Sequence, residues 1–168
     1  MASNLALKIT SVTKNIAELY RADELPWIIG YSGGKDSTTV LQLVWRAVET
    51  IPVEERTKKI YVISTDTLVE NPVVARWVQL SLSKINVASQ KGKMNIEARR
   101  LVPKLEDRFW VNLIGKGYPA PRPKFRWCTS RLKINASTDF VRNVATERGE
   151  AILFLGTRSG ESQARKKV

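Results

Sequence analysis

The sequence predicts an α/β protein with a doubly wound, mainly parallel sheet preceded by an N-terminal helix. Short apolar runs of strand length alternate with longer segments of helical periodicity, and a glycine-rich turn joins the first run to the following helix. This alternation is typical of βαβ units, whose crossover helices return the chain so that successive strands run parallel. Ligand sites in such sheets lie at the carboxyl ends of the strands.

The first half of the chain supplies the clearest elements. Apolar residues recur every three or four positions over residues 5–20, which predicts an amphipathic helix. The apolar run at residues 27–31 predicts a buried strand that stops at a Ser-Gly-Gly turn. A wide apolar stripe over residues 38–50 predicts a helix that Pro52 ends.

The remaining elements follow from the same rules: a strand at 60–64, a helix at 73–87 started by Asn71 and Pro72, a helix at 137–148 and a strand at 151–155. Between them, prolines and glycines interrupt residues 96–133, so this region is predicted to be mostly loop. Residues 91–94 are expected to form a polar connection. The predicted order is therefore a repeated strand and helix.

Length and composition fit one globular domain over residues 1–168, since 43% of the residues are hydrophobic. The chain ends directly after a strand and its loop, so we expect the N-terminal part of a longer protein. No apolar stretch reaches the roughly 20 residues of a membrane span, and no signal peptide precedes the first helix, which favours a cytoplasmic location.

The charge balance indicates a polyanionic partner. The chain carries 28 Lys and Arg against 16 Asp and Glu, a net charge of +12, and such a density attracts nucleic acids or nucleotides. A basic face that only confers solubility, or that docks on an acidic protein, is the alternative. The chain contains no histidine, which excludes histidine bases, histidine metal ligands and Ser-His or Cys-His systems within it.

A glycine-rich turn carries the most specific motif, formed by Ser32, Gly33, Gly34, Lys35, Asp36 and Ser37. Free backbone N–H groups and the positive end of a helix favour a phosphate at such a turn, and the glycines permit close approach. It is not a Walker loop, because only three residues separate Gly30 from Gly34 and an aspartate follows the lysine. The alternative is a tight turn in which Asp36 or Ser37 only caps the helix.

These six residues match the SGGKDS signature of the PP-loop, or adenine nucleotide alpha-hydrolase-like, superfamily, which the chain resembles. The resemblance implies an ATP pyrophosphatase: ATP binds with its pyrophosphate in the loop, the α-phosphate is attacked, and pyrophosphate leaves. Lys35 and the loop amides would neutralise the leaving group, and Mg²⁺ would bridge phosphate oxygens. Asp66, at the end of the second predicted strand, is expected either to hold ribose hydroxyls or magnesium, or to act only as a loop cap.

The single cysteine, Cys128, lies in sequence among Arg126, Arg131 and Lys133. Neighbouring cations favour the thiolate, which serves as nucleophile or metal ligand; the alternative is a small buried hydrophobe. Residues 128–133 resemble the Cys-x-x-Arg-x-Lys segment of the phosphoadenylylsulfate (PAPS) reductase-like branch of the superfamily.

A second motif of that branch, Gly-x-Arg-x-x-Glu-Ser-x-x-Arg, is similar to residues 156–165. It assigns Arg158 and Glu161 to the ATP site, with Arg158 binding nucleotide phosphate or the acceptor. The alternative for Arg158 is a surface ion pair with Glu161.

Residues 98–107 and 109–119 are similar to the DndC-type sulfurtransferases of bacterial DNA phosphorothioation, and this resemblance runs from about Tyr20 to the chain end. It implies that ATP activates the DNA backbone so that sulfur replaces a non-bridging phosphate oxygen. The implied partners are DNA, a cysteine desulfurase as sulfur donor and the other phosphorothioation subunits. A 4Fe-4S cluster is also implied, but Cys128 alone cannot assemble one, so the remaining ligands would lie outside this chain. Cys128 is expected as a free thiol or as part of a disordered loop.

Three other functions stay open at this point. A sulfonucleotide (PAPS or APS) reductase and a tRNA thiolation enzyme share the superfamily, although the former would not by itself explain so basic a domain. A non-catalytic ATP-sensing subunit that binds DNA belongs to a different class. Formation of AMP separates the enzymes from the sensor.

Overall fold

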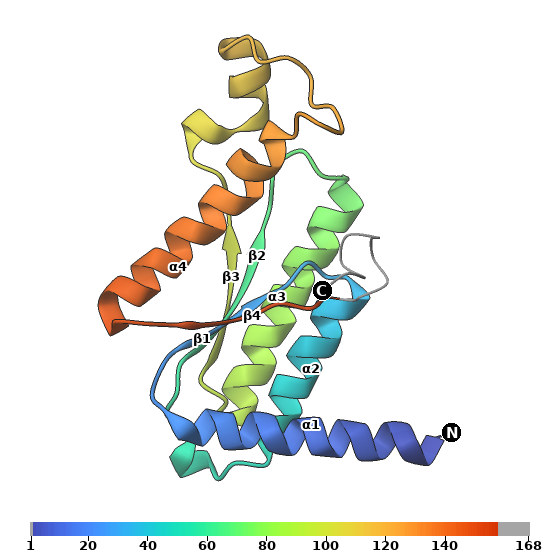
Figure 1. The fold of residues 1–168 in the computed structure, drawn as a ribbon, viewed down its shortest axis with the longest axis vertical. Helices are drawn as coiled ribbons and strands as arrows, with labels where there is room; N and C mark the ends of the chain where they lie inside the picture. The colour runs from blue at the N-terminus through green and yellow to red at the C-terminus, as the bar shows by residue number, and fades with distance from the viewer. Residues whose placement is uncertain (1, 158–168) are drawn as a thin grey trace.

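The structure is a computed structural model that describes residues 2–157. It contains one four-stranded parallel sheet with the strand order β3-β2-β1-β4 (Figure 1). The principal elements are α1 (Ala2–Ala22), β1 (Trp27–Gly30), α2 (Lys35–Glu49), β2 (Ile60–Thr65), α3 (Pro72–Gly92), β3 (Ile96–Leu101), α4 (Asn135–Arg148) and β4 (Ile152–Phe154). The predicted α/β class with a parallel sheet is confirmed. Over the described part of the chain, no helix is long and apolar enough to cross a membrane.

Helices cover both faces of the sheet, as a doubly wound fold requires. Trp27 and Ile29 of β1 face one side and pack in a core with α1, α2 and α3. Ile28, between them, faces the other side and packs with Ile63 and with Val144 of α4. Because side chains alternate along a strand, both faces need apolar residues, which explains the continuous apolar run of β1.

The strand order creates a switch point beside β1. From β1 the chain moves outward through β2 to β3, and it then returns by α4 to place β4 on the opposite side of β1. Trp27 is accordingly the register partner of Ile60 in β2 and of Ile152 in β4. The switch point therefore lies between β1 and β4, and its carboxyl edge is where parallel sheets form ligand crevices.

The prediction that residues 96–133 are mostly loop was wrong, because β3 pairs with β2 from Ile96 to Leu101. Only Ile96 and Ala98 of this strand are buried, so its sequence lacks the apolar run that marked the other strands. At the outer edge of β3, the side chain of Asn86 from α3 makes the backbone hydrogen bonds that a neighbouring strand would otherwise make. It accepts from the Ala98 N–H at 2.7 Å and donates to the Ala98 carbonyl at 3.0 Å. Long-range pairing, rather than local pattern, makes this strand.

Helix boundaries also differ from the predictions. Helix α3 runs to Gly92, so the expected polar connection at residues 91–94 is partly helical. Helix α4 begins at Asn135 and continues a π-helical stretch, Thr129–Ile134, since no proline follows Pro123 to interrupt it. The predicted cap of α3 is confirmed: the Asn71 side chain accepts from the Val73 N–H at 2.9 Å.

Residues 102–134 leave β3 and project past the carboxyl ends of β2 and β3 before α4 returns to the sheet (Figure 1). We call this segment, coloured yellow to orange, the arm. It holds the π-helical stretches Val111–Gly115 and Thr129–Ile134, a further departure from the predicted loop. The arm stands at the same edge of the sheet as the switch point.

At the opposite end, a buried lysine precedes β2. The side chain of Lys58 is 1% exposed, and its ammonium donates to Asp23 Oδ1 at 2.7 Å. The same ammonium lies 5.2 Å from the ring centre of Tyr20 and 4.9 Å from that of Trp27. The hydrogen bond from Lys58 lowers the pKa of the Asp23 carboxyl. This group ties the end of α1 to the sheet.

Candidate functional site

A cavity of about 550 Å³ lies at the carboxyl edge of the sheet. Its lining comes from the ends of all four strands and from the two helices that flank this edge; representative residues are Gly30, Ser64, Arg100, Gly156, Val78 and Ser137. The volume falls within the roughly 300–1,000 Å³ of small-molecule sites. The cavity therefore occupies the position that the strand order predicts for a ligand.

The glycine-rich loop after β1 has a shape that its own residues fix. Gly33 adopts φ +74°, the left-handed region that favours glycine, and a Cβ there would lie 3.0 Å from Val78 Cγ2. The Ser37 hydroxyl donates to the Gly34 carbonyl at 3.0 Å and accepts from the Ser32 N–H at 3.2 Å. The loop is thus closed by its two serines.

Helix α2 begins at Lys35, directly after this loop, and no side chain caps it at Gly34. The first N–H groups of a helix and its dipole favour an anion, so the start of α2 suits a phosphate. Ser32 and Ser37 line the cavity, whereas Gly33, Gly34, Lys35 and Asp36 do not. Lys35 is exposed beside the loop, where its ammonium can approach a ligand from outside the cavity.

The end of β4 packs directly against the start of α2. A Cβ at Gly156 would lie 2.7 Å from the Asp36 carbonyl oxygen and 3.0 Å from the Ser37 nitrogen. Only glycine fits at this approach without moving the backbone. The switch point thus joins the loop after β1 to the chain after β4, and Gly156 and Thr157 line the cavity beside Ser37.

Asp66 lies in the cavity wall at the end of β2, with both carboxylate oxygens bonded. Oδ1 accepts from the Leu68 N–H at 2.8 Å, which is the loop-cap geometry. Oδ2 accepts from Arg100 Nε at 2.9 Å and Nη2 at 2.6 Å. A second ion pair in the same wall joins Lys133 to Glu70 at 3.1 Å.

Sequence reasoning missed several lining residues. Arg100 was not assigned to a site because β3 was not predicted as a strand, and only that strand carries its side chain to Asp66. Ser137 was assigned only to a helix start, yet its hydroxyl lies 3.0 Å from the Thr65 hydroxyl, and both residues line the cavity. The polar pattern of residues 137 and 138 at the start of α4 was the available signal.

Cys128 is a half-buried cysteine on the arm, and it lies outside the cavity lining. Two of the three cations near it in sequence have other partners. Arg131 binds Asp107 and Tyr118, and Lys133 binds Glu70. Proximity in sequence therefore does not direct these two cations at the sulfur.

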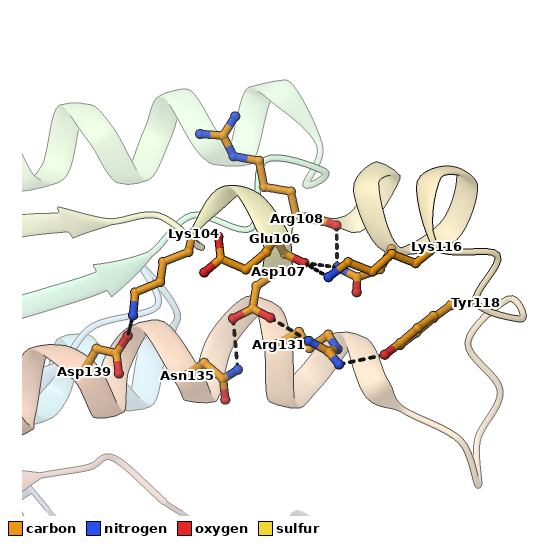
Figure 2. A network of polar contacts seen from close by, with 10 residues as sticks. Lys104, Glu106, Asp107, Arg108, Lys116, Tyr118, Arg131, Asn135 and Asp139 are labelled. Carbon is orange, nitrogen blue, oxygen red and sulfur yellow. Dashed lines mark hydrogen bonds and ion pairs between the residues drawn. The ribbon is translucent and has the colours of Figure 1, made fainter.

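Asp107 organises the polar network that joins the arm to α4 (Figure 2). It is buried, and its Oδ1 accepts from Arg131 at 2.8 Å while its Oδ2 accepts from Asn135 at 3.0 Å. Burial alone would raise the pKa of the Asp107 carboxyl, but the bonds from Asn135 and Arg131 outweigh it and hold that pKa below its usual value. Arg131 also donates to the Tyr118 hydroxyl at 2.7 Å.

The same network extends to both sides of Asp107. Lys104 pairs with Asp139 of α4 at 2.8 Å, and the Lys116 ammonium donates to the Glu106 carbonyl at 2.7 Å (Figure 2). The base of the arm is therefore held in one position relative to α4 and to the cavity that α4 lines.

Arg158 and Glu161, which the sequence assigned to the site, lie outside the described residues. Among residues 2–157, no group of three or more Cys, His, Asp or Glu side chains is placed to hold a metal ion. No protein-family model matches the chain, and neither does any curated protein.

Proposed function

We propose that the chain is an ATP pyrophosphatase domain that cleaves MgATP to AMP and pyrophosphate and thereby activates the DNA backbone for sulfur incorporation in phosphorothioate modification. The observation that carries the proposal is the SGGKDS loop at residues 32–37, which begins a helix beside a cavity of about 550 Å³. The first backbone N–H groups of α2 and the helix dipole suit a pyrophosphate, and the cavity is large enough for an adenosine.

In this proposal, some residues of the loop bind the pyrophosphate and others stabilise its developing negative charge. Pyrophosphate would lie on the amides that follow Gly34, with the Lys35 ammonium beside it. Negative charge develops on the departing pyrophosphate as the bond to the α-phosphate breaks, and a fixed cation stabilises that charge most in the transition state. The serine bonds hold the loop in this shape before the ligand arrives.

Asp66 is proposed to hold a ribose hydroxyl. A carboxylate offers about four acceptor positions, and Leu68 and Arg100 use three of them. The ion pair with Arg100 fixes the orientation of the carboxylate at the cavity wall.

The cavity does not fit a magnesium site held by the protein. Its two carboxylates, Asp66 and Glu70, are both paired with cations, while Mg²⁺ prefers near-octahedral oxygen ligands and often takes them from substrate phosphates and water. Magnesium would therefore enter as part of MgATP. The lone Cys128 likewise does not fit a four-cysteine cluster, and no step of the proposal passes through one.

Sulfur chemistry is assigned to Cys128, the only thiol of the chain. It lies on the arm outside the cavity, so it would take no part in ATP cleavage. Its thiolate would attack the outer sulfur of a persulfide on the cysteine desulfurase, form a persulfide on Cys128 and release the desulfurase thiolate. The variant Cys128→Ser is accordingly expected to form AMP normally but to incorporate no sulfur into DNA when the desulfurase and the other phosphorothioation subunits are supplied.

The decisive experiment incubates the protein with magnesium, ATP and DNA and identifies the nucleotides by chromatography. We expect AMP and pyrophosphate, with AMP formation lowered by about 10²- to 10³-fold in Lys35→Ala. Lys84→Ala, which removes an exposed lysine from α3, is the matched control and should leave the rate unchanged.

Three outcomes would contradict the proposal. ADP as the product would place cleavage at the wrong phosphate. ATP binding without turnover would favour the non-catalytic sensor, and AMP formation stimulated by tRNA but not by DNA would favour tRNA thiolation.

A further inference from the structure

The arm concentrates positive charge. Residues 102–134 carry eight Lys and Arg against two Asp and Glu, which is half of the net charge of +12 in about a fifth of the chain. Lys104, Arg131 and Lys133 are paired with carboxylates. The other five cations are exposed and form no ion pair with any residue in 2–157: Arg108, Lys116, Arg122, Lys124 and Arg126. Of these, Lys116 donates to the Glu106 carbonyl.

Three of these five cations lie on or beside one tight turn. The backbone groups of Arg122 and Phe125 exchange both hydrogen bonds, at 3.0 and 2.9 Å, so residues 122–125 form a closed turn with Lys124 near its tip. Pro123 restricts the backbone at this turn further. Arg126 follows directly. A turn closed in this way presents its cations in a fixed arrangement.

An aromatic cluster holds the turn against the rest of the arm. The indole N–H of the buried Trp127 donates to the Pro119 carbonyl at 2.9 Å, so residues on both sides of the turn are joined. Trp127 also stacks on Phe109, with ring centres 5.4 Å apart and planes at 20°. Tyr118 meets the same indole edge-on and connects it to Arg131 and Asp107.

Two aromatic side chains remain exposed among these cations. Phe125 is 47% exposed and Trp110 is 59% exposed. Exposed rings flanked by lysine and arginine match a nucleic acid, in which bases stack on rings while phosphates pair with cations. An acidic protein surface would use the cations but leave the rings without a comparable partner.

The arm also leads into the cavity. Its last residues, Lys133 and Ile134, line the cavity wall, and the Asp107 network fixes the base of the arm to α4. We propose that the arm binds DNA with an unpaired base: Arg122, Lys124 and Arg126 hold backbone phosphates, and Phe125 stacks on the base. This inference rests on the proposed function, which supplies DNA as the acceptor, and it names the surface that would bring a backbone position to the cavity.

Fluorescence anisotropy with a labelled single-stranded DNA oligonucleotide, without ATP, tests the inference. We expect Arg122→Ala/Lys124→Ala to weaken binding at least tenfold and to lower the slope of log affinity against log salt by about 1.4, because two phosphate contacts are lost. Phe125→Ala should weaken binding about fivefold to 150-fold with the salt slope unchanged, and Phe125→Tyr should restore it. Lys84→Ala/Lys91→Ala removes two exposed charges from α3 and should change affinity less than twofold.

The inference is overturned if the arm variants bind like the parent, if the α3 control loses as much affinity as the arm double variant, or if the parent does not bind the oligonucleotide. Tighter binding to RNA of the same sequence would overturn the assignment to DNA. Thermal unfolding of each variant excludes loss of fold as the cause. Binding in this assay needs no ATP, so the two proposals are tested independently. If the arm variants bind DNA like the parent, the proposed ATP cleavage is not contradicted. If no AMP forms, the result of the binding assay still holds.

Discussion

The two ends of the sheet both place cations beside aromatic rings, with opposite outcomes. At the amino end, Lys58 is buried against Tyr20 and Trp27 and is paired with Asp23. At the carboxyl end, the arm exposes Phe125 next to cations that no described carboxylate neutralises. A cation beside a ring therefore stabilises the fold where a carboxylate neutralises its charge, and it offers a binding surface where charge and ring are left to solvent.

The base of the arm combines both situations. Asp107, Arg131 and Asn135 satisfy one another in a partly buried network, while the turn beyond them stays open. A rigid base is what allows an exposed turn to present charge at a fixed position, since ordering the turn on binding would otherwise cost conformational entropy. The following predictions test this division, from the largest expected effect to the smallest.

Asp23→Ala should cause the largest loss of stability, because it leaves the buried Lys58 ammonium without a carboxylate. We expect the free energy of unfolding to fall by about 3 kcal/mol, the lower end for breaking a buried ion pair, since the Asp23 side chain is 33% exposed. Urea denaturation measures the change. Adding Lys58→Met to this variant should recover part of the loss, and a single variant as stable as the parent would show that water reaches Lys58.

Asp107→Ala should destabilise the base of the arm by about 1–3 kcal/mol, because Arg131 and Asn135 lose a shared acceptor in a buried position. Hydrogen exchange should rise within residues 102–134 and stay unchanged in β1 and β2. Asp139→Ala, which breaks the more exposed pair with Lys104, is the control and should have a much smaller effect. Uniform exchange across the sheet would contradict a local role for the network.

Acidification should lower the stability of the protein at both ends of the sheet, because the pKa values of Asp23 and Asp107 are lowered in the folded protein. The stability that these carboxylates contribute is complete above the unfolded pKa of about 3.9 and is lost as pH falls through the lower folded pKa. The melting temperature should therefore fall below about pH 4. In Asp107→Asn the fall should be shallower, and a pH profile identical to that of the parent would contradict the assignment.

Gly33→Ala should have the smallest effect on stability, about 1 kcal/mol, because it forces an L side chain into a left-handed backbone at φ +74°. Its Cβ would also press on Val78 and disturb the loop, so ATP binding measured by calorimetry should weaken. Gly115→Ala is the control, since nothing lies within 4 Å of its Cβ position. Unchanged ATP affinity in Gly33→Ala would show that the loop is not part of the nucleotide site.

The parts of the fold that rest on local chemistry were predictable. The strand at β1 followed from an apolar run, the start of α3 from the Asn71 cap, and the loop of residues 32–37 from its glycines. Each depends on propensities or hydrogen bonds within a few residues, so the sequence itself carries the signal. The candidate phosphate-binding end of the site was found for the same reason.

The parts that rest on distant partners were not predictable. β3 is a strand because β2 and Asn86 pair with it, and Arg100 reaches Asp66 only once that strand exists. The arm is held by the aromatic rings that pack on Trp127 and by the hydrogen bonds of Asp107. These contacts join residues that lie up to 28 positions apart in the sequence. Prolines in this region correctly indicated breaks, but they do not show what the intervening segments pack against.

By itself, the sequence determined the parallel α/β class, the glycine loop and the excess of positive charge, because periodicity, turn chemistry and composition are local or additive properties. The tertiary structure alone decided which charges are neutralised. Lys58 and Arg131 meet carboxylates 35 and 24 residues away, whereas Arg122 and Lys124 meet none among the described residues. The distinction between a structural cation and a cation free to bind depends on contacts between distant residues, and only folding creates them.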